Sequence, residues 1–280
     1  MIIVKVYGGL GNQIFQFIFG KYLEQISKHD VYFDFFYFEK NSYRKPSLLQ
    51  CVTEDKLKVL KDDNLHLKFN RFDSFYINRI FNKIKHNNIY FDENKVFDIN
   101  TFSSKNIYYF DGYWQNNIYF LNISQNIESF FNRSVIIPNL IQEIAIHVRR
   151  GDYLNYPNNK IWHVQNVNYY STAINYLLAK YSRQFSFSRI TIFTDDTLWV
   201  KENFNFGLKV EIISNQDFID LFQLSNYQFL ITSNSTFSIT AALINSNKLK
   251  TVIVPKTWYL DDQANSQIID QLYLKEWIKI

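Results

Sequence analysis

Two adjacent arginines are the side chains in this sequence best suited to bind an anion. Arg149 and Arg150 follow the apolar run 143–148, and Gly151 and Asp152 come next. A guanidinium presents a planar fork of N–H donors that matches two phosphate oxygens, and it stays charged at any ordinary pH. The pair therefore predicts an anion-binding site. The alternative is that the arginines form salt bridges with nearby carboxylates such as Asp152.

The arginines follow a predicted strand, which determines where their side chains lie. Side chains alternate along an extended strand, so His147 and Arg149 are expected on one face and Arg150 on the other. One arginine can then contact a ligand while its neighbour makes a different contact.

Two other short loops carry groups that favour anions. The loop from Gly8 to Gln13 precedes a predicted helix, so its amides lie at a helix N-terminus, where the dipole favours negative charge. It lacks the last glycine of a dinucleotide fingerprint and the lysine of a P-loop, and a plain strand-to-helix turn is the alternative. The run from Ser233 to Thr236 offers hydroxyls and amides, with a simple N-cap as its alternative.

Asp195 and Asp196 are the carboxylate pair most suggestive of a metal site. They are adjacent, so at a strand end their carboxylates are expected to point apart, which suits a ribose or base contact better than a shared ion. An N-cap role for one of them is the alternative. No ligand spacing links the histidines outside the arginine motif, so no metal site is predicted; these are His29, His66, His86 and His163.

A regular alternation of strands and helices is predicted to bring these loops together. Short apolar strands are predicted at 143–148, 189–194, 209–213, 227–232 and 251–254, with helices at 168–181, 197–203, 216–224 and 237–245. This order favours a parallel sheet covered on both faces, whose ligands bind beyond the carboxyl ends of the strands. The loops 149–152, 194–196 and 233–236 are therefore expected to converge on one ligand.

The first half of the chain shows a weaker version of the same pattern. Residues 2–7 predict a strand and 8–11 a turn, and Asn12 is expected to cap the helix that follows. Further strands are predicted at 31–38 and 107–110, while 41–105 reads as helices and loops. Pro138 and Asn139 mark a boundary, and the chain is expected to form two domains, 1–140 and 141–280.

Composition narrows the class of protein. Of 280 residues 47% are hydrophobic, and Lys plus Arg (30) barely exceeds Asp plus Glu (26). The hydrophobic residues suffice for two cores. The small excess of positive charge gives no indication of nucleic-acid binding, although it is compatible with an anionic substrate. The single Cys51 excludes an intramolecular disulfide and favours a reducing compartment. With no export signal and no apolar stretch long enough to span a bilayer, we expect a cytoplasmic protein, soluble or peripheral to the inner membrane.

Six motifs, taken in order, resemble those of the bacterial α-1,2-fucosyltransferases, glycosyltransferase family 11, which are inverting enzymes that use GDP-fucose. The motifs are residues 8–16 (GGLGNQIFQ), 112–115 (GYWQ), 147–153 (HVRRGDY), 193–196 (FTDD), 234–238 (NSTFS) and 254–259 (VPKTWY). Each motif is weak alone, but six in this order cover nearly the whole chain and are specific.

The resemblance implies an α/β fold of the GT-B type, with two Rossmann-like domains facing across a cleft. The C-terminal domain is expected to bind GDP-fucose and the N-terminal domain the acceptor, with the C-terminal segment able to pack back on the first domain. By the same resemblance Arg149 binds the diphosphate with support from Arg150. The other residues expected at the donor are His147, Asp195 and Asp196 near the guanosine, Ser235, Thr236 and Phe237 on the phosphate side, and Gly9, Gly11, Asn12 and Gln13 from the first domain.

The function that the resemblance implies is transfer of L-fucose from GDP-β-L-fucose to the 2-hydroxyl of a β-galactoside in a surface glycan, such as the O-antigen of lipopolysaccharide. No metal or cofactor is expected. Tyr113, Trp114 and Gln115 suit an acceptor sugar, with aromatic core packing as the equal alternative. Asp152 and His163 are the candidate general bases, because both lie near the arginines in sequence. Transfer of another sugar or linkage, or a non-catalytic nucleotide-sugar or glycan-binding module, are the alternatives.

Overall fold

The computed structural model describes residues 1–40, 43–69, 89–91, 106–123, 127–132 and 140–280. The chain divides into two compact units, a first unit Met1–Asn132 and a second unit Arg133–Ile280. The boundary that the sequence predicts at Pro138 and Asn139 lies outside the described residues, as does most of the stretch 70–105. Each unit is built around a parallel sheet of its own, in agreement with the predicted α/β class.

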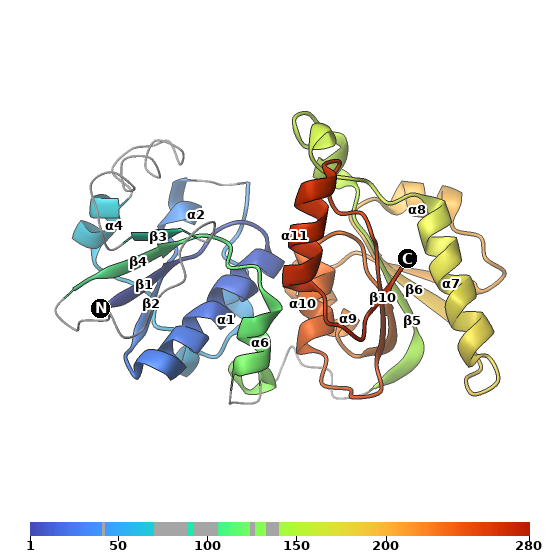
Figure 1. Cartoon of the computed structure of the whole chain (residues 1–280), viewed down its shortest axis with the longest axis horizontal. Coiled ribbons are helices and arrows are strands. Elements are labelled where there is room, and N and C mark those ends of the chain that lie inside the picture. Colours follow the sequence, from blue (N-terminus) through green and yellow to red (C-terminus); the bar gives the residue numbers. More distant parts are fainter. Residues whose placement is uncertain (41–42, 70–88, 92–105, 124–126, 133–139) are drawn as a thin grey trace. The chain divides into compact units, whose positions relative to one another are not determined.

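The first unit contains a four-stranded parallel sheet in the order β2-β1-β4-β3 (Figure 1). Its strands are β1 (Ile2–Lys5), β2 (Val31–Asp34), β3 (Ile89–Phe91) and β4 (Tyr108–Asp111). Its helices are α1 (Leu10–Ser27), α2 (Phe36–Lys40), α3 (Leu48–Cys51), α4 (Asp63–Phe69) and α6 (Asn117–Asn122), with 3-10 turns η1 (Glu54–Lys56) and η3 (Ile127–Phe130). β1 is buried along its whole length, as expected of a central parallel strand.

Two local predictions for the first unit are wrong. The strand predicted at 31–38 ends at Asp34, because the Asp34 carboxylate accepts a hydrogen bond from the Phe36 N–H (2.9 Å) and starts helix α2 instead. The helix after the glycine loop is not capped by Asn12: Gly9 is its N-cap residue, and Asn12 already lies within the first turn of α1. Gly8 has φ +82°, a conformation that favours glycine, so the chain can turn sharply from β1 into α1.

The second unit contains a six-stranded parallel sheet in the order β10-β9-β8-β5-β6-β7. Its strands are β5 (Ile141–Val148), β6 (Arg189–Thr194), β7 (Lys209–Ile213), β8 (Tyr227–Ile231), β9 (Thr251–Val254) and β10 (Ile278–Lys279). Its helices are α7 (Val167–Tyr181), α8 (Thr197–Asn203), α9 (Asp217–Leu224), α10 (Thr236–Ile244) and α11 (Asp262–Leu272), with 3-10 turns η4 (Gly151–Leu154) and η5 (Asn158–Lys160). The predicted strands and helices of this half are confirmed to within two residues at each end, while α11 and β10 were not predicted.

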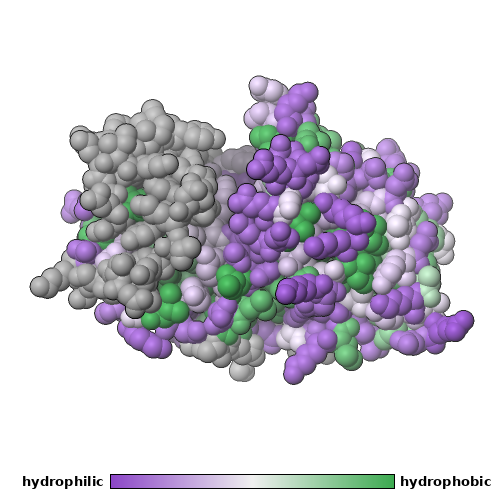
Figure 2. Space-filling view, viewed as in Figure 1, coloured by the Kyte–Doolittle hydropathy of each residue, from purple (hydrophilic) through white to green (hydrophobic). Residues whose placement is uncertain are grey.

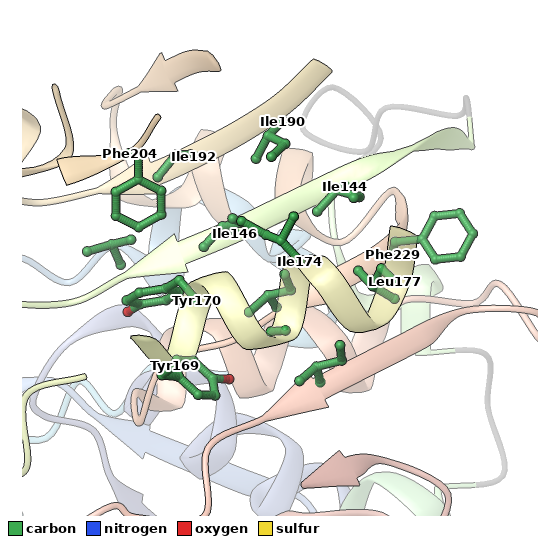
Figure 3. Close-up of a cluster of buried hydrophobic side chains, with 14 of the residues drawn as sticks. Ile144, Ile146, Tyr169, Tyr170, Ile174, Leu177, Ile190, Ile192, Phe204 and Phe229 are labelled. Atoms are coloured by element: carbon green, nitrogen blue, oxygen red, sulfur yellow. The ribbon is translucent and has the colours of Figure 1, made fainter. Parts of the chain in front are cut away.

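The apolar side chains of the second unit form a core on the face of the sheet that α7 covers. Ile144 and Ile146 of β5 and Ile190 and Ile192 of β6 are fully buried, and Ile174 of α7 packs against the same cluster (Figure 3). Helix α10 lies on the opposite side of the sheet (Figure 1). On the face shown in Figure 2, hydrophilic side chains cover most of the described surface of this unit. Among the described residues, no helix has both the length and the apolar character needed to cross a membrane.

The strand order defines where the second unit can bind a ligand. From β5 the chain adds β6 and β7 on one side and then returns to add β8, β9 and β10 on the other. The order therefore reverses between β5 and β8, and in open parallel sheets ligands bind beyond the carboxyl ends of the strands at such a switch point. The residues that follow Val148 of β5 and Ile231 of β8 are the arginine motif and the run 232–236.

Candidate active site

Arg149 lies at the carboxyl end of β5, fixed between two carboxylates. Its Nη2 is 2.5 Å from Asp152 Oδ1, and its Nη1 is 2.8 Å from Asp195 Oδ2. Burial lowers the pKa of Arg149, but the charges of Asp195 and Asp152 outweigh this effect, so the pKa of the guanidinium is raised above its ordinary value. The Arg149 side chain keeps 23% of its surface exposed, so a ligand can reach a permanent and well-oriented positive charge.

Arg150 points to a different set of partners, as strand alternation predicts. Its Nε donates to Asp196 Oδ2 (3.1 Å), and its guanidinium lies 4.0 Å from the centre of the Trp199 ring, a cation–π contact. Its backbone N–H donates to Asp195 Oδ1 (2.9 Å). Arg150 therefore ties the end of β5 to the loop after β6 and supports Arg149 through their shared partner, Asp195.

The salt bridges that the sequence suggested as an alternative to anion binding are therefore present in the structure. Two arginines meet three carboxylates, which gives the group a formal charge of −1. An incoming phosphate would be repelled by the carboxylates, so its binding must rely on the remaining guanidinium N–H groups and on nearby backbone amides. A guanidinium has five N–H donors, and the carboxylates fix its plane before a ligand arrives.

Asp195 and Asp196 have separate roles. Asp196 is the N-cap of α8, where its Oδ1 accepts from the Trp199 N–H (3.0 Å), so the N-cap alternative holds for this residue. Asp195 closes over Gly151: a Cβ placed on that glycine would be 2.5 Å from Asp195 Oδ2. Each carboxylate forms its salt bridge with a different guanidinium, Asp195 with that of Arg149 and Asp196 with that of Arg150.

His147 joins β5 to the residues after β8 at the switch point. Its Nδ1 is 2.8 Å from Ser233 Oγ, and its ring stacks on Phe237 with centroids 5.0 Å apart. Burial, with a smaller contribution from the Arg149 charge, lowers the pKa of His147 to about 3. The imidazole is therefore neutral at physiological pH and packs against Phe237.

Ser235 begins helix α10 as its N-cap residue. Its side chain accepts from the Phe237 N–H at 3.4 Å, which is the capping role that the sequence offered as the alternative. Thr236 is the first residue of α10, a helix of nine residues. The N-terminus of α10 thus follows the carboxyl end of β8, beside the end of β5, and its dipole favours an anion there.

The two candidate bases lie on the segment between β5 and α7. Asp152 belongs to η4, and its carboxylate is bound to Arg149. His163 is half-buried, and burial lowers its pKa, so its imidazole is neutral and able to accept a proton at neutral pH. The backbone N–H of His163 donates to the Trp258 carbonyl (3.1 Å), which anchors this part of the segment.

The glycine loop of the first unit is fixed by amide side chains. Gln13 is 1% exposed, and its Nε2 donates to the Gly8 and Lys45 carbonyls at 2.9 and 2.8 Å. The Gln13 side chain thus stabilises the conformation of the loop. Asn12 is half-buried and accepts from Gln115 Nε2 (2.9 Å), while Gly9 is half-buried and Gly11 is buried.

The aromatic motif after β4 divides between core and surface. Trp114 is 6% exposed and stacks on Phe19 with ring centroids 4.2 Å apart, so core packing is the correct interpretation for this residue. Tyr113 is 38% exposed and packs one side against Tyr7, at 4.7 Å between centroids. Tyr113 and the half-buried Gln115 are therefore the members of the motif that a sugar could reach.

The sequence assigned no individual role to three side chains of the second unit, although Tyr153 and Asn234 lie within motifs named above. Trp199 stacks on Arg150, Tyr153 lies 5.5 Å from the Arg149 guanidinium, and the Asn234 side chain binds two backbone carbonyls. Trp199 stands three positions after Asp196 in the first turn of α8, a spacing that could have revealed it. The partners of Asn234 are more than twenty residues away in the chain, and no local pattern reveals them.

Comparison with known proteins adds independent information. The family described as Glycosyl transferase family 11 matches the chain over residues 1–280. An alpha-1,2-colitosyltransferase from Escherichia coli is 26% identical over 287 residues, covering 95% of each chain. The O-antigen biosynthesis glycosyltransferase WbnK, also from E. coli, is 26% identical over 306 residues, covering 98% of each.

The second unit and the first together also match a solved structure. The crystal structure of the fucosyltransferase NodZ from Bradyrhizobium aligns with a TM-score of 0.50 at 14% identity, covering 87% of this chain and 92% of that one. At this identity the likeness concerns the fold. It confirms the predicted GT-B class, in which two Rossmann-like units are joined in one chain.

Proposed function

The chain belongs to glycosyl transferase family 11, and from that premise we propose that it transfers L-fucose from GDP-β-L-fucose to the 2-hydroxyl of a β-galactoside. The acceptor in this proposal is part of a surface glycan such as an O-antigen, the role named for one of the E. coli relatives. We assign the donor to the second unit and the acceptor sugar to the first unit, where Tyr113 and Gln115 are accessible.

The observation that carries the proposal is the fixed positive charge of Arg149 at the switch point of the second sheet. When the acceptor hydroxyl attacks the anomeric carbon from the side opposite to GDP, the bond to the diphosphate breaks and negative charge grows on the leaving oxygen. A preoriented guanidinium stabilises that charge more in the transition state than in the bound donor. The N-terminus of α10 adds backbone N–H groups on the neighbouring strand end.

Inversion also requires that the attacking hydroxyl lose its proton. Of the two candidates, Asp152 is bound to Arg149, whereas His163 is half-buried and has a lowered pKa. We therefore assign the base to His163 and a structural role to Asp152. A His163→Gln variant is expected to lose turnover by roughly a hundredfold with little change in GDP affinity. Loss in Asp152→Asn with normal turnover in His163→Gln would reverse the assignment.

One alternative donor has support of its own. A relative that is 26% identical over most of both chains is named a colitosyltransferase, and colitose is L-fucose without its 3-hydroxyl. A side-by-side assay with GDP-linked fucose and GDP-linked colitose distinguishes the two donors. Binding of GDP without turnover of either donor across a panel of galactosides would instead favour a non-catalytic module.

The deciding experiment combines an acceptor assay with a matched pair of arginine variants. Purified protein is incubated with GDP-β-L-fucose and lactose, GDP release is measured, and the new linkage is assigned by NMR. Arg149→Ala is expected to reduce turnover by roughly a hundredfold to a thousandfold. Arg189→Ala is the control, because Arg189 also binds two carboxylates, Glu143 and Glu211, but lies at the amino end of β6, opposite to the carboxyl ends where Arg149 lies. Near-normal turnover by folded Arg149→Ala protein would refute the role of that residue.

A further inference from the structure

Two irregular segments beside the candidate site are held together by buried amide side chains, in addition to the backbone hydrogen bond from the His163 N–H to the Trp258 carbonyl (3.1 Å). The segments are 163–165 and 257–259, which are joined near one end by the isolated bridge between Trp162 and Tyr259. Buried backbone groups outside regular structure still need hydrogen-bond partners. Three amide side chains supply them here: Asn234 (0% exposed), Gln165 (4%) and Asn265 (8%).

Asn234 is the centre of this amide network. Its Nδ2 donates to the carbonyls of His163 (2.6 Å) and Trp258 (2.8 Å), one in each segment. Its Oδ1 accepts from Gln165 Nε2 at 3.4 Å, and Gln165 also donates to the Thr257 carbonyl at 2.6 Å. Both donors of the Asn234 amide are thus used to join two stretches of chain that lie about ninety residues apart.

The backbone of Asn234 reaches the other side of the site. Its carbonyl accepts from the Tyr153 hydroxyl (3.1 Å), and the Tyr153 ring lies 5.5 Å from the Arg149 guanidinium. Its neighbours in the chain are Ser233, which binds His147, and Ser235, which caps α10. A single fully buried residue therefore connects the anion-binding strand ends with the segment that carries His163.

We propose that Asn234 is a positioning residue that sets the distance between the leaving-group charge at Arg149 and the base at His163. This inference rests on the proposed function, since it assumes that these two groups act on one reaction. Asn234 itself would touch neither donor nor acceptor. Its loss should leave the GDP site formed but remove the partner of the His163 carbonyl, so that this backbone is held only through its N–H bond to Trp258 and becomes less well fixed. Small misplacements of a reacting group reduce turnover strongly.

The test compares Asn234→Ala with Asn245→Ala. Asn245 is a matched control, because it is also a buried asparagine (4% exposed) whose Nδ2 donates to a backbone carbonyl, that of Tyr227 (2.8 Å). It follows the C-terminal end of α10 and contacts the amino end of β8, away from the carboxyl ends of the strands. Hydrogen exchange of the segments 163–165 and 257–259, GDP affinity by calorimetry, and turnover of GDP-β-L-fucose with lactose are measured in both variants.

In Asn234→Ala we expect faster exchange in both segments, GDP affinity within about threefold of the native value, and turnover lower by roughly a hundredfold. In Asn245→Ala we expect normal exchange in the segments and turnover within about twofold of the native value. If Asn234→Ala does not fold, Asn234→Ser takes its place: the smaller hydroxyl keeps one donor but cannot bond both carbonyls, and the same changes in exchange and turnover are expected.

Three outcomes would overturn the inference. One is unchanged exchange in the two segments of Asn234→Ala. Another is faster exchange with native turnover. The third is an equal loss of GDP affinity and turnover in both asparagine variants, which would show a general loss of stability. If the native protein neither bound GDP nor turned over the donor, the proposed function would fail instead, and the exchange data would still decide whether Asn234 holds the two segments.

Discussion

The buried His147 makes the stability of the second unit depend on pH in a way that can be measured. Its pKa is lowered from 6.5 to about 3, first by burial and then by the Arg149 charge. Between pH 6.5 and about pH 3, His147 is protonated in the unfolded chain but not in the folded chain. The contribution of the neutral imidazole is therefore fully present above pH 6.5 and decreases as the pH falls from there towards 3.

The size of the effect follows from the shift. Each pH unit below the unfolded pKa costs about 1.4 kcal/mol, so at about pH 5 the folded state loses about 2 kcal/mol through this residue. The perturbation is His147→Asn, which places an amide near the position of Nδ1, keeps a partner for Ser233 and does not titrate.

The assay is urea unfolding followed by tryptophan fluorescence, at about pH 7 and about pH 5, for the native protein and His147→Asn. Every other titratable group is common to the two proteins, so its contribution cancels in the comparison. The native protein should lose about 2 kcal/mol more than the variant between the two pH values. Equal losses in the two proteins would refute the conclusion that His147 is buried in its neutral form.

Two further predictions concern the carboxylates around the arginines. Gly151→Ala should raise the KM for GDP-β-L-fucose by roughly tenfold. The new Cβ would lie 2.5 Å from Asp195 Oδ2 and would displace the carboxylate that orients Arg149. Steady-state kinetics measure this KM, and an unchanged value would contradict the prediction. Turnover should be unaffected by EDTA, because Asp195 and Asp196 form salt bridges with two different guanidinium groups instead of holding one ion. Activity that is lost in EDTA and restored by Mn²⁺ would show that this interpretation is wrong.

Most strands of the second unit were predictable because their local composition is typical of strands. β6, β7 and β9 have the predicted bounds, since each is a short apolar or β-branched run between polar residues. β10 has two residues, Ile278 and Lys279, and a strand of that length has no periodicity to detect. Its pairing with β9 depends on the tertiary fold.

The first unit shows why aromatic runs mislead. Phe35 and Phe36 extend the strand-like composition of β2, but Asp34 ends the strand by binding the Phe36 N–H. The other oxygen of Asp34 accepts from the Tyr109 hydroxyl (2.7 Å) on β4. This contact joins residues 75 positions apart, so local composition could not have predicted it.

The candidate site was predictable in its residue types and less so in its contacts. Alternation along β5 correctly separated Arg149 from Arg150. Asp152 is the one partner that the sequence suggested for the arginines. Asp195 and Asp196 could not be assigned as partners, because they follow the next strand and only the parallel pairing of β5 with β6 brings them close. The network around Asn234 depends in the same way on three separate segments.

The position of β5 in the middle of its sheet has a consequence for synthesis of the chain. While the nascent polypeptide extends only to residue 226, β5 can pair with β6, but its other edge has no neighbour until β8 (Tyr227–Ile231) has emerged. For the time needed to make some eighty residues, an apolar strand edge is exposed to association with other chains. His147 likewise cannot contact Ser233 until that residue has been made, so the contact between the two strand ends forms only after β8 has emerged.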